Sequence, residues 1–391
     1  MKSFLVAALA SSILFDGLAG ADEGLATDLF ADAPPIRIES VRARYTHYDQ
    51  TGLGYQSQAG PTMGPGLENA TVEQAQLEVV AKQGKLTHRL WVPLDVITAA
   101  SPDAIDGDFR IGVDTVSQAS RVNEAGSIEL QTTYQADSRT AAFVRAGFHI
   151  EEMFRSWVVG AGFSRSFADD NAVFAASVNQ VYDWFDTFLI DGERVGHGDR
   201  STTNANIGLT QLLSPTTIAH VNYGVTLQLG ELSNTYNSVP LVTGVRGAEL
   251  LPHLRQRHAL VARLAQWLPW NGAIHLFYRF YADDWGVLAH TVETELYQRL
   301  APTVYVRLNY RVHVQRAVDF YTTLAPDDGS FRTGDSDLSA FVAQTVGAKL
   351  SIDFPSRGRL RDAHFDVAAE RYFRSNGLRA SIASCAVGFR F

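Results

Sequence analysis

Residues 303–316 read TVYVRLNYRVHVQR, and throughout this segment apolar side chains alternate with polar or charged ones. In an extended strand the apolar residues from Val304 to Val314 share one face, whereas Arg307 and Arg311 lie on the opposite face. A water-soluble sandwich would turn the valine face toward a core, whereas a membrane barrel would turn it toward lipid and enclose the arginines. The alternation therefore predicts a strand, and the rest of the chain must decide what surrounds it.

Alternating segments recur along the chain, and no helical period competes with them. No stretch approaches the roughly 18 consecutive apolar residues of a transmembrane helix. The pattern predicts an all-β chain of about 16 antiparallel strands, at residues 36–48, 72–82, 85–97, 127–136, 139–149, 153–167, 171–183, 203–213, 216–229, 256–267, 272–282, 287–299, 303–316, 338–352, 364–374 and 378–391.

The connections between these strands alternate in length. The turns 83–84, 214–215 and 301–302 are followed by the long segments 98–126, 230–255 and 317–337, respectively. Outer-membrane barrels have short periplasmic turns and longer external loops, whereas a soluble sandwich has no reason to sort loops in this way. The connections thus favour a transmembrane β-barrel.

Proline and tryptophan positions agree with a barrel. Of thirteen prolines only Pro93 falls inside a predicted strand, where its missing N–H predicts a strained or frayed end of the third strand. Trp267 and Trp270 are predicted at one rim and Trp184 and Trp285 at the other, as aromatic girdles require.

The final segment, SIASCAVGFRF, alternates and places Phe389 and Phe391 on one face. An alternating strand that ends in an aromatic residue resembles the signal read by the outer-membrane barrel-assembly machinery. We therefore expect the Phe-ended strand to close the barrel.

The first residues, MKSFLVAALASSILFDGLAGA, combine Lys2, an apolar core and a small-residue cleavage site. They predict a secretory signal peptide at residues 1–21, followed by a periplasmic linker at 22–35 and the barrel at 36–391. Cys385 is the single cysteine, which excludes an intramolecular disulfide, a CxxCH haem site and a cysteine-based zinc site. The net charge of −9 argues against nucleic acid as a partner, and we predict no metal site.

Charged residues on the polar faces of three successive strands predict a charged inner wall. They are Arg279, Glu293, Glu295, Arg307 and Arg311. Two interpretations follow: a constriction in a channel for small polar or anionic solutes, or a cross-strand ladder of salt bridges that stiffens a scaffold. A charge on the lipid face would cost about 2–4 kcal/mol at mid-depth, so these side chains are expected to point inward.

Catalysis is not expected. Ser375-Asn376-Gly377 resembles the segment around the nucleophile of an outer-membrane phospholipase, but the neighbouring Phe373 and Arg374 leave no histidine to act as base. Asn376-Gly377 is typical of a two-residue hairpin turn. The chain is therefore predicted not to be an enzyme.

Two heptapeptides, at residues 95–101 and 114–120, share the pattern D-x-x-[ST]-x-A-[ST]. Asp and Ser are good turn formers, so a duplicated Asx-turn would produce the same pattern. The alternative is a recognition motif.

Four segments carry a resemblance to a known family: WLPWNGAIHLFYRFYADDWGVLAHTVETEL, VQRAVDFY, LTQLLSPTT and PLDVITAASPD. They resemble a family of Gram-negative outer-membrane proteins catalogued only as a domain of unknown function. The resemblance implies an outer-membrane barrel without an assigned activity.

The heptapeptides are in addition similar to the acceptor motif of periplasmic FMN transferases, which join FMN to a hydroxyl of the motif's last residue. This similarity implies Ser101 and Ser120 as acceptors and Asp95 and Asp114 as recognition residues. Thr98 and Ser117 belong to the same two motifs and are included as candidate cofactor-binding residues. The usual Gly before the Ala is Ala99 or Gln118 here, and the usual acceptor Thr is Ser. Covalent FMN would make the barrel an electron carrier across the outer membrane.

These observations predict an outer-membrane location after export. The expected partners are outer-membrane lipid, lipopolysaccharide and the barrel-assembly machinery. A periplasmic FMN transferase or redox protein is added if the flavin alternative holds.

Overall fold

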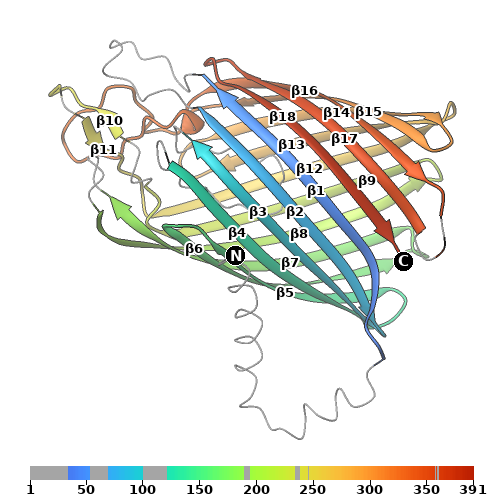
Figure 1. The fold of residues 1–391 in the computed structure, drawn as a ribbon. Helices are drawn as coiled ribbons and strands as arrows, with labels where there is room; N and C mark the ends of the chain where they lie inside the picture. The colour runs from blue at the N-terminus through green and yellow to red at the C-terminus, as the bar shows by residue number, and fades with distance from the viewer. Residues whose placement is uncertain are drawn as a thin grey trace, which may run out of the picture.

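The computed structural model describes residues 34–52, 69–99, 121–188, 194–233, 238–244, 246–356, 358 and 361–391. Sixteen of its strands form one closed antiparallel barrel, in which each strand pairs with the strands next to it along the chain (Figure 1). The barrel strands are β1 Arg37–Thr51, β2 Ala70–Gln83, β3 Leu86–Ala99, β4 Arg121–Gln135, β5 Thr140–Ile150, β6 Phe154–Phe167, β7 Ala172–Phe188, β8 Arg194–Ser214, β9 Thr217–Gly230, β12 Leu254–Leu268, β13 Gly272–Asp283, β14 Leu288–Ala301, β15 Val304–Gln315, β16 Phe341–Phe354, β17 Arg361–Arg374 and β18 Arg379–Arg390.

Three short elements lie outside the barrel wall. The strands β10 (Ser238–Pro240) and β11 (Arg246–Ala248) pair with each other, and the 3₁₀ helix η1 covers Ser336–Leu338. No helix among the described residues is long and apolar enough to cross a membrane.

The barrel is closed by its first and last strands. Ser40 lies opposite Arg390 and Thr51 lies opposite Arg379, so β1 and β18 pair along most of their length. The backbone N–H of Phe391 donates to the carbonyl of Glu39 at 3.0 Å just beyond β18. The prediction that the Phe-ended strand closes the barrel is confirmed.

The connections sort by length as expected. One end of the barrel carries turns such as 84–85, 215–216 and 302–303, and we call it the short-turn end. The other end carries the long segments, including 231–253 and 316–340, and we call it the long-loop end. Figure 1 shows the β10–β11 hairpin beyond the long-loop end and the C-terminus at the opposite end.

The outer surface of the barrel is apolar. On β15, Leu308 is 51% exposed, Tyr310 is similarly exposed, and the intervening Asn309 is 5% exposed. The valine-rich face of this strand is on the outside of the barrel. Segment 303–316 therefore has its apolar side outward, the reverse of its arrangement in a soluble sandwich. Large apolar side chains are exposed on the outer faces of the other strands as well, for example Val144, Trp157 and Val367. Such a surface is suited to lipid.

All sixteen predicted strands are present, and the largest errors lie at the long-loop end. β8 begins at Arg194 rather than at residue 203, and β7 continues to Phe188. These extensions pair with each other, and Asp186 there bonds both Arg194 and His197. The β8 extension, which begins RVGHGDRST, is rich in glycine and charged residues and does not alternate, so the predicted strand began too late.

The expectation that Pro93 marks a strained or frayed end of the third strand is wrong. Pro93 is buried in the middle of β3, opposite Gln76 of β2, and the strand continues to Ala99. The described ladder from β3 to β4 stops at Trp91 and resumes at Leu94. The missing N–H is therefore accommodated by a local gap in the ladder rather than by a frayed strand end.

The expectation for Trp285 is wrong as well. Trp270 and Trp184 are exposed near opposite ends of the barrel, and Trp267 is exposed close to Trp270. Trp285, in contrast, is only 5% exposed and packs against Val287 and Val318 under the loops. The segment before it, Asp283-Asp284, turns its ring away from the lipid. The predicted signal peptide and most of the predicted linker lie outside the described residues.

Candidate functional site

The inner face of β14 and β15 carries two ion pairs among the residues predicted from sequence. Arg311 lies opposite Glu293, and its Nη2 is 2.9 Å from Glu293 Oε2. Arg307 contacts Glu295 and Glu370, each at 3.2 Å. The strand register therefore places each arginine beside a carboxylate of the neighbouring strand or of the strand two positions away.

Arg279 is on the same wall, on the strand next to β14. It lies on β13 opposite Thr291, and its guanidinium is 5.4 Å from the centre of the Tyr281 ring. The five predicted residues are thus brought to one wall, in two ion-paired groups with Arg279 beside them.

The ion pairs continue around the wall beyond the residues predicted from sequence. Asp366 on β17 contacts Lys349 at 2.9 Å and Arg42 at 3.2 Å, so it links three strands across the β1–β18 closure. Arg145 and Glu129 form a further pair on the opposite side at 3.6 Å. Lys349 is an isolated charge among small and apolar residues of β16, and Asp366 alternates with Phe365 and Val367 on β17; these two patterns are the signals that could have identified them.

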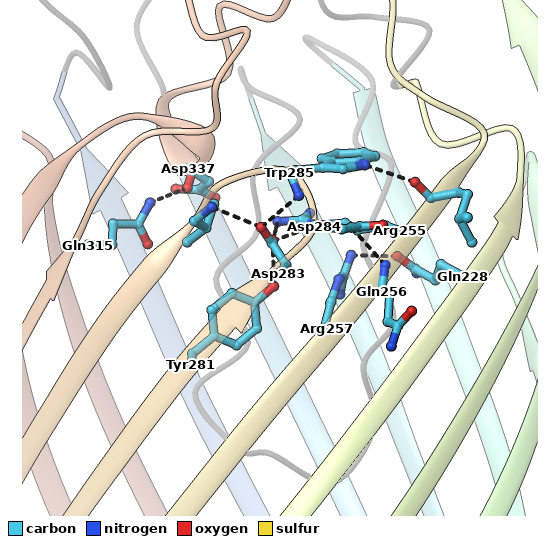
Figure 2. Close-up of polar contacts among 12 residues, drawn as sticks. Gln228, Arg255, Gln256, Arg257, Tyr281, Asp283, Asp284, Trp285, Gln315 and Asp337 are labelled. Carbon is cyan, nitrogen blue, oxygen red and sulfur yellow. Dashed lines mark hydrogen bonds and ion pairs between the residues drawn. The ribbon is translucent and has the colours of Figure 1, made fainter.

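A second group of polar contacts holds the long-loop end together (Figure 2). The Asp283 carboxylate accepts from Arg255 Nη2 at 2.6 Å and from the Tyr281 hydroxyl at 2.9 Å. It also accepts from the backbone N–H groups of Trp285 at 3.1 Å and Val287 at 2.9 Å. One fully buried carboxylate therefore fixes the tight turn between β13 and β14.

The segment 316–340 is anchored on the inner wall by Arg374. The buried Arg374 guanidinium contacts Asp337 Oδ1 at 2.5 Å and donates to the Ser336 carbonyl at 2.8 Å. It also lies 3.7 Å from the centre of the Phe341 ring. Gln315 donates to the carbonyl of Asp337 at 2.7 Å from a neighbouring strand (Figure 2). The helix η1 is thereby held against β15, β16 and β17.

The same segment packs against the segment 231–253. Leu241 bridges to Ala325, and Leu250 pairs with Arg332 through two backbone hydrogen bonds. Arg332 is buried between the two segments, and its Nε donates to the Ala248 carbonyl at 3.1 Å. We call these two packed segments, 231–253 and 316–340, the loop pair. Its apolar contacts with Trp285 bury the inner face of the barrel wall at this end.

Asparagine side chains lie over glycines on the inner wall. Asn206 and Asn222 face Gly224 and Gly208 across β8 and β9, within two copies of the pattern Asn-x-Gly. A Cβ on Gly224 would lie 2.8 Å from Asn206 Oδ1. The same arrangement joins Asn309 to Gly347. Glycine inside a strand often marks such close approach, so this signal was present in the sequence and was not used.

The first heptapeptide of the FMN alternative lies partly within the barrel. Asp95 is in β3, between Gln74 of β2 and Ala125 of β4, and Thr98 belongs to the same strand. Leu94 and Val96 are exposed on the outer face, so Asp95 points inward. An Asx-turn at Asp95 is therefore excluded. The other four predicted residues lie outside the described part of the chain: Ser101, Asp114, Ser117 and Ser120.

Ser375-Asn376-Gly377 forms the turn between β17 and β18. Ser375 Oγ accepts a hydrogen bond from the backbone N–H of Val342 at 3.0 Å, and Gly377 has a φ of 96°. Among the described residues no group of three or more His, Cys, Asp or Glu side chains is placed to hold a metal ion.

A closed sixteen-stranded barrel with an apolar exterior and ion pairs on its inner face is a transmembrane β-barrel of the outer-membrane type. The chain belongs to the family described as a protein of unknown function (DUF3570), which matches residues 120–383, more than half of its length. The resemblance to a family without an assigned activity is thereby confirmed. No curated protein sequence matches the chain.

Several solved structures are similar to the chain. OpdK of Pseudomonas aeruginosa with vanillate has 8% identity and a TM-score of 0.44, covering 92% of this chain and 99% of OpdK. A bacterial polysaccharide outer membrane secretin has 9% identity and a TM-score of 0.46, covering 89% and 98%. A BenF-like porin from Pseudomonas fluorescens Pf-5 has 9% identity and a TM-score of 0.45, covering 90% and 99%. The function of this chain has to be argued from its own residues.

Proposed function

We propose that the protein is an outer-membrane channel for small polar and anionic solutes. The apolar outer face requires a lipid environment, and the signal peptide predicted from sequence directs the chain to the periplasm. The short-turn end would then face the periplasm and the loop pair would face the exterior.

The observation that carries this proposal is the partial exposure of the ion pairs inside the barrel. Arg311 retains 41% exposure of its side chain although it points away from lipid, and Arg307 and Glu370 are partly exposed as well. Charges that keep contact with solvent on the inside of a closed barrel imply a hydrated interior. A scaffold with a filled interior would bury them.

Planar-bilayer recording tests the proposal. The purified barrel is expected to give discrete conductance steps in potassium chloride. The double variant Glu293→Gln/Glu295→Gln neutralises both inner carboxylates. In a salt gradient it should shift the reversal potential toward the equilibrium potential of chloride.

Glu73→Gln is the matched control. Glu73 lies on the outer face of β2 and contacts His47 at 2.7 Å, so its neutralisation should leave the reversal potential unchanged. A folded barrel that shows no steps would contradict a channel and favour a scaffold. A reversal potential that both variants shift equally would contradict the role of the two inner carboxylates in ion selection.

The flavin-bearing barrel is the alternative. The position of Asp95 within the paired strand β3 adds a requirement, since a transferase would have to meet the first heptapeptide before β3 pairs with its neighbours. Ser120 lies outside the described residues.

A further inference from the structure

A recess of about 180 Å³ lies on the inner wall between β4 and β9. It is well separated along the wall from the ion pairs of β14 and β15, which belong to strands on the far side of β12 and β13. Its lining combines two phenylalanines with small, amide and imidazole side chains, among them Phe143, Ala175, Ser177, Asn206, His220 and Asn222.

The recess exists because the wall residues beneath it lack side-chain bulk. A Cβ on Gly162 would lie 2.5 Å from the Phe143 ring, so the ring occupies space that any other residue at position 162 would fill. A Cβ on Gly208 would lie 3.2 Å from Asn222 Oδ1 and 3.3 Å from His220 Cε1. The two glycines thus let an aromatic ring and two polar side chains lie close to the wall.

The polar groups around the recess retain hydrogen-bonding capacity. Asn222 Nδ2 donates to Asn206 Oδ1 over a long 3.5 Å, which uses one of several donors and acceptors on these two amides. His220 contacts Thr210 Oγ1 through Nδ1 at 2.9 Å, so its Nε2 is the nitrogen that can meet a ligand. Donors and acceptors beside an apolar ring are the combination that recognises a hydroxylated ring.

A cation completes the site. Arg263 lies directly opposite His220 across β12 and β9, and its guanidinium is 5.2 Å from the centre of the Phe277 ring. It is exposed, and the described residues place no carboxylate within ion-pairing distance of it. Arg307 and Arg311, in contrast, both face carboxylates. Arg263 does not line the recess itself, but it is exposed beside His220 on the next strand, where it suits a carboxylate on a ligand held at the β9 side.

We propose that this recess is a binding subsite for a small hydroxylated carboxylate of the sugar-acid class. The ligand lies at the β8–β9 side of the recess, where its hydroxyl groups bond Asn206 and Asn222 and its carboxylate meets Arg263 on the adjoining strand β12. The inference rests on the proposed function, because a subsite inside the barrel matters when solutes pass through it.

Calorimetric titration of the detergent-purified protein tests the subsite without measuring transport. The probes are sodium D-galacturonate, D-galactose and sodium acetate, and galacturonate is expected to bind at least fivefold more tightly than either of the others. Ala175→Leu fills the recess and should weaken galacturonate binding at least tenfold. Arg263→Gln should remove the preference for galacturonate over galactose while leaving galactose binding unchanged.

Ala368→Leu makes the same change on the opposite wall and is the matched control. Equal losses in Ala175→Leu and Ala368→Leu, or equal binding of all three probes, would overturn the subsite. If galacturonate binds as expected but bilayers show no conductance, the subsite stands and the channel fails. If bilayers show conductance without this binding, the subsite alone fails.

Discussion

Replacing Arg374 with methionine should release the loop pair from the inner wall. The arginine makes a charge-assisted bond to the Ser336 carbonyl, an ion pair with Asp337 and a cation–π contact with Phe341. Asp337 is 39% exposed, so solvent screening reduces the ion pair to about 1 kcal/mol. With the carbonyl bond and the ring contact, the anchor is worth about 3 kcal/mol, while methionine keeps most of the apolar packing.

Trypsin cleavage after Arg332 reports this release. Arg332 is buried between the two segments, and its Nη1 donates to the Pro326 carbonyl at 3.0 Å. A protease can therefore reach it only when the loop pair opens. A loss of about 3 kcal/mol corresponds to roughly a hundredfold larger open population, and the cleavage rate should rise by that factor.

Two further variants make the test specific. Asp337→Asn removes only the screened ion pair and should raise the cleavage rate about fivefold. Arg379→Met changes an exposed arginine at the start of β18 and should have no effect. If Arg374→Met folds into the barrel and is cleaved after Arg332 at the wild-type rate, the anchoring role assigned to Arg374 is wrong.

Three other predictions test the lipid face, the inner wall and the flavin alternative. Leu308→Arg should destabilise the barrel in lipid vesicles by about 2–4 kcal/mol in urea unfolding, whereas Ser384→Arg on the inner face should cost far less; similar costs would contradict the assigned faces. Gly347→Ala should lower single-channel conductance, because its Cβ would lie 2.6 Å from the facing asparagine amide and push that amide inward, and an unchanged conductance would refute this. In cells that contain an FMN transferase, flavin fluorescence should stay with the denatured protein on a gel and disappear in Ser101→Ala/Ser120→Ala; a band without fluorescence in the unsubstituted protein would end the flavin alternative.

The strand faces could be predicted from sequence because a barrel wall repeats one simple rule. The wall is a single sheet, so each strand has one face toward lipid and one toward the interior. Alternation in a segment such as 303–316 therefore determines which residues meet lipid and which point inward. The pairs Glu293–Arg311 and Glu295–Arg307 followed from this rule and from the adjacency of strands that are consecutive in the chain. The alternation within each strand and the order of the strands were sufficient to predict these two ion pairs.

The contacts at the long-loop end could not be predicted in this way. Trp285 was assigned to a rim because tryptophan is common there, but the Asp283 carboxylate bonds the backbone of its turn and directs the ring under the loop pair. Contacts such as Leu241 with Ala325 join segments more than eighty residues apart without any periodic signal. The recess was missed for a related reason, since it depends on Gly162 and Gly208 and on what fills the space they leave.

The closure between β1 and β18 has a consequence for biogenesis. The pairing of Ser40 with Arg390 joins the first and last strands of the barrel, so a chain that lacks either strand cannot complete the cylinder. Until the final strand arrives, both edges expose unpaired amides and carbonyls that lipid cannot satisfy. The cylinder therefore cannot close before β18 has been made, and β1 has to stay available for pairing until then.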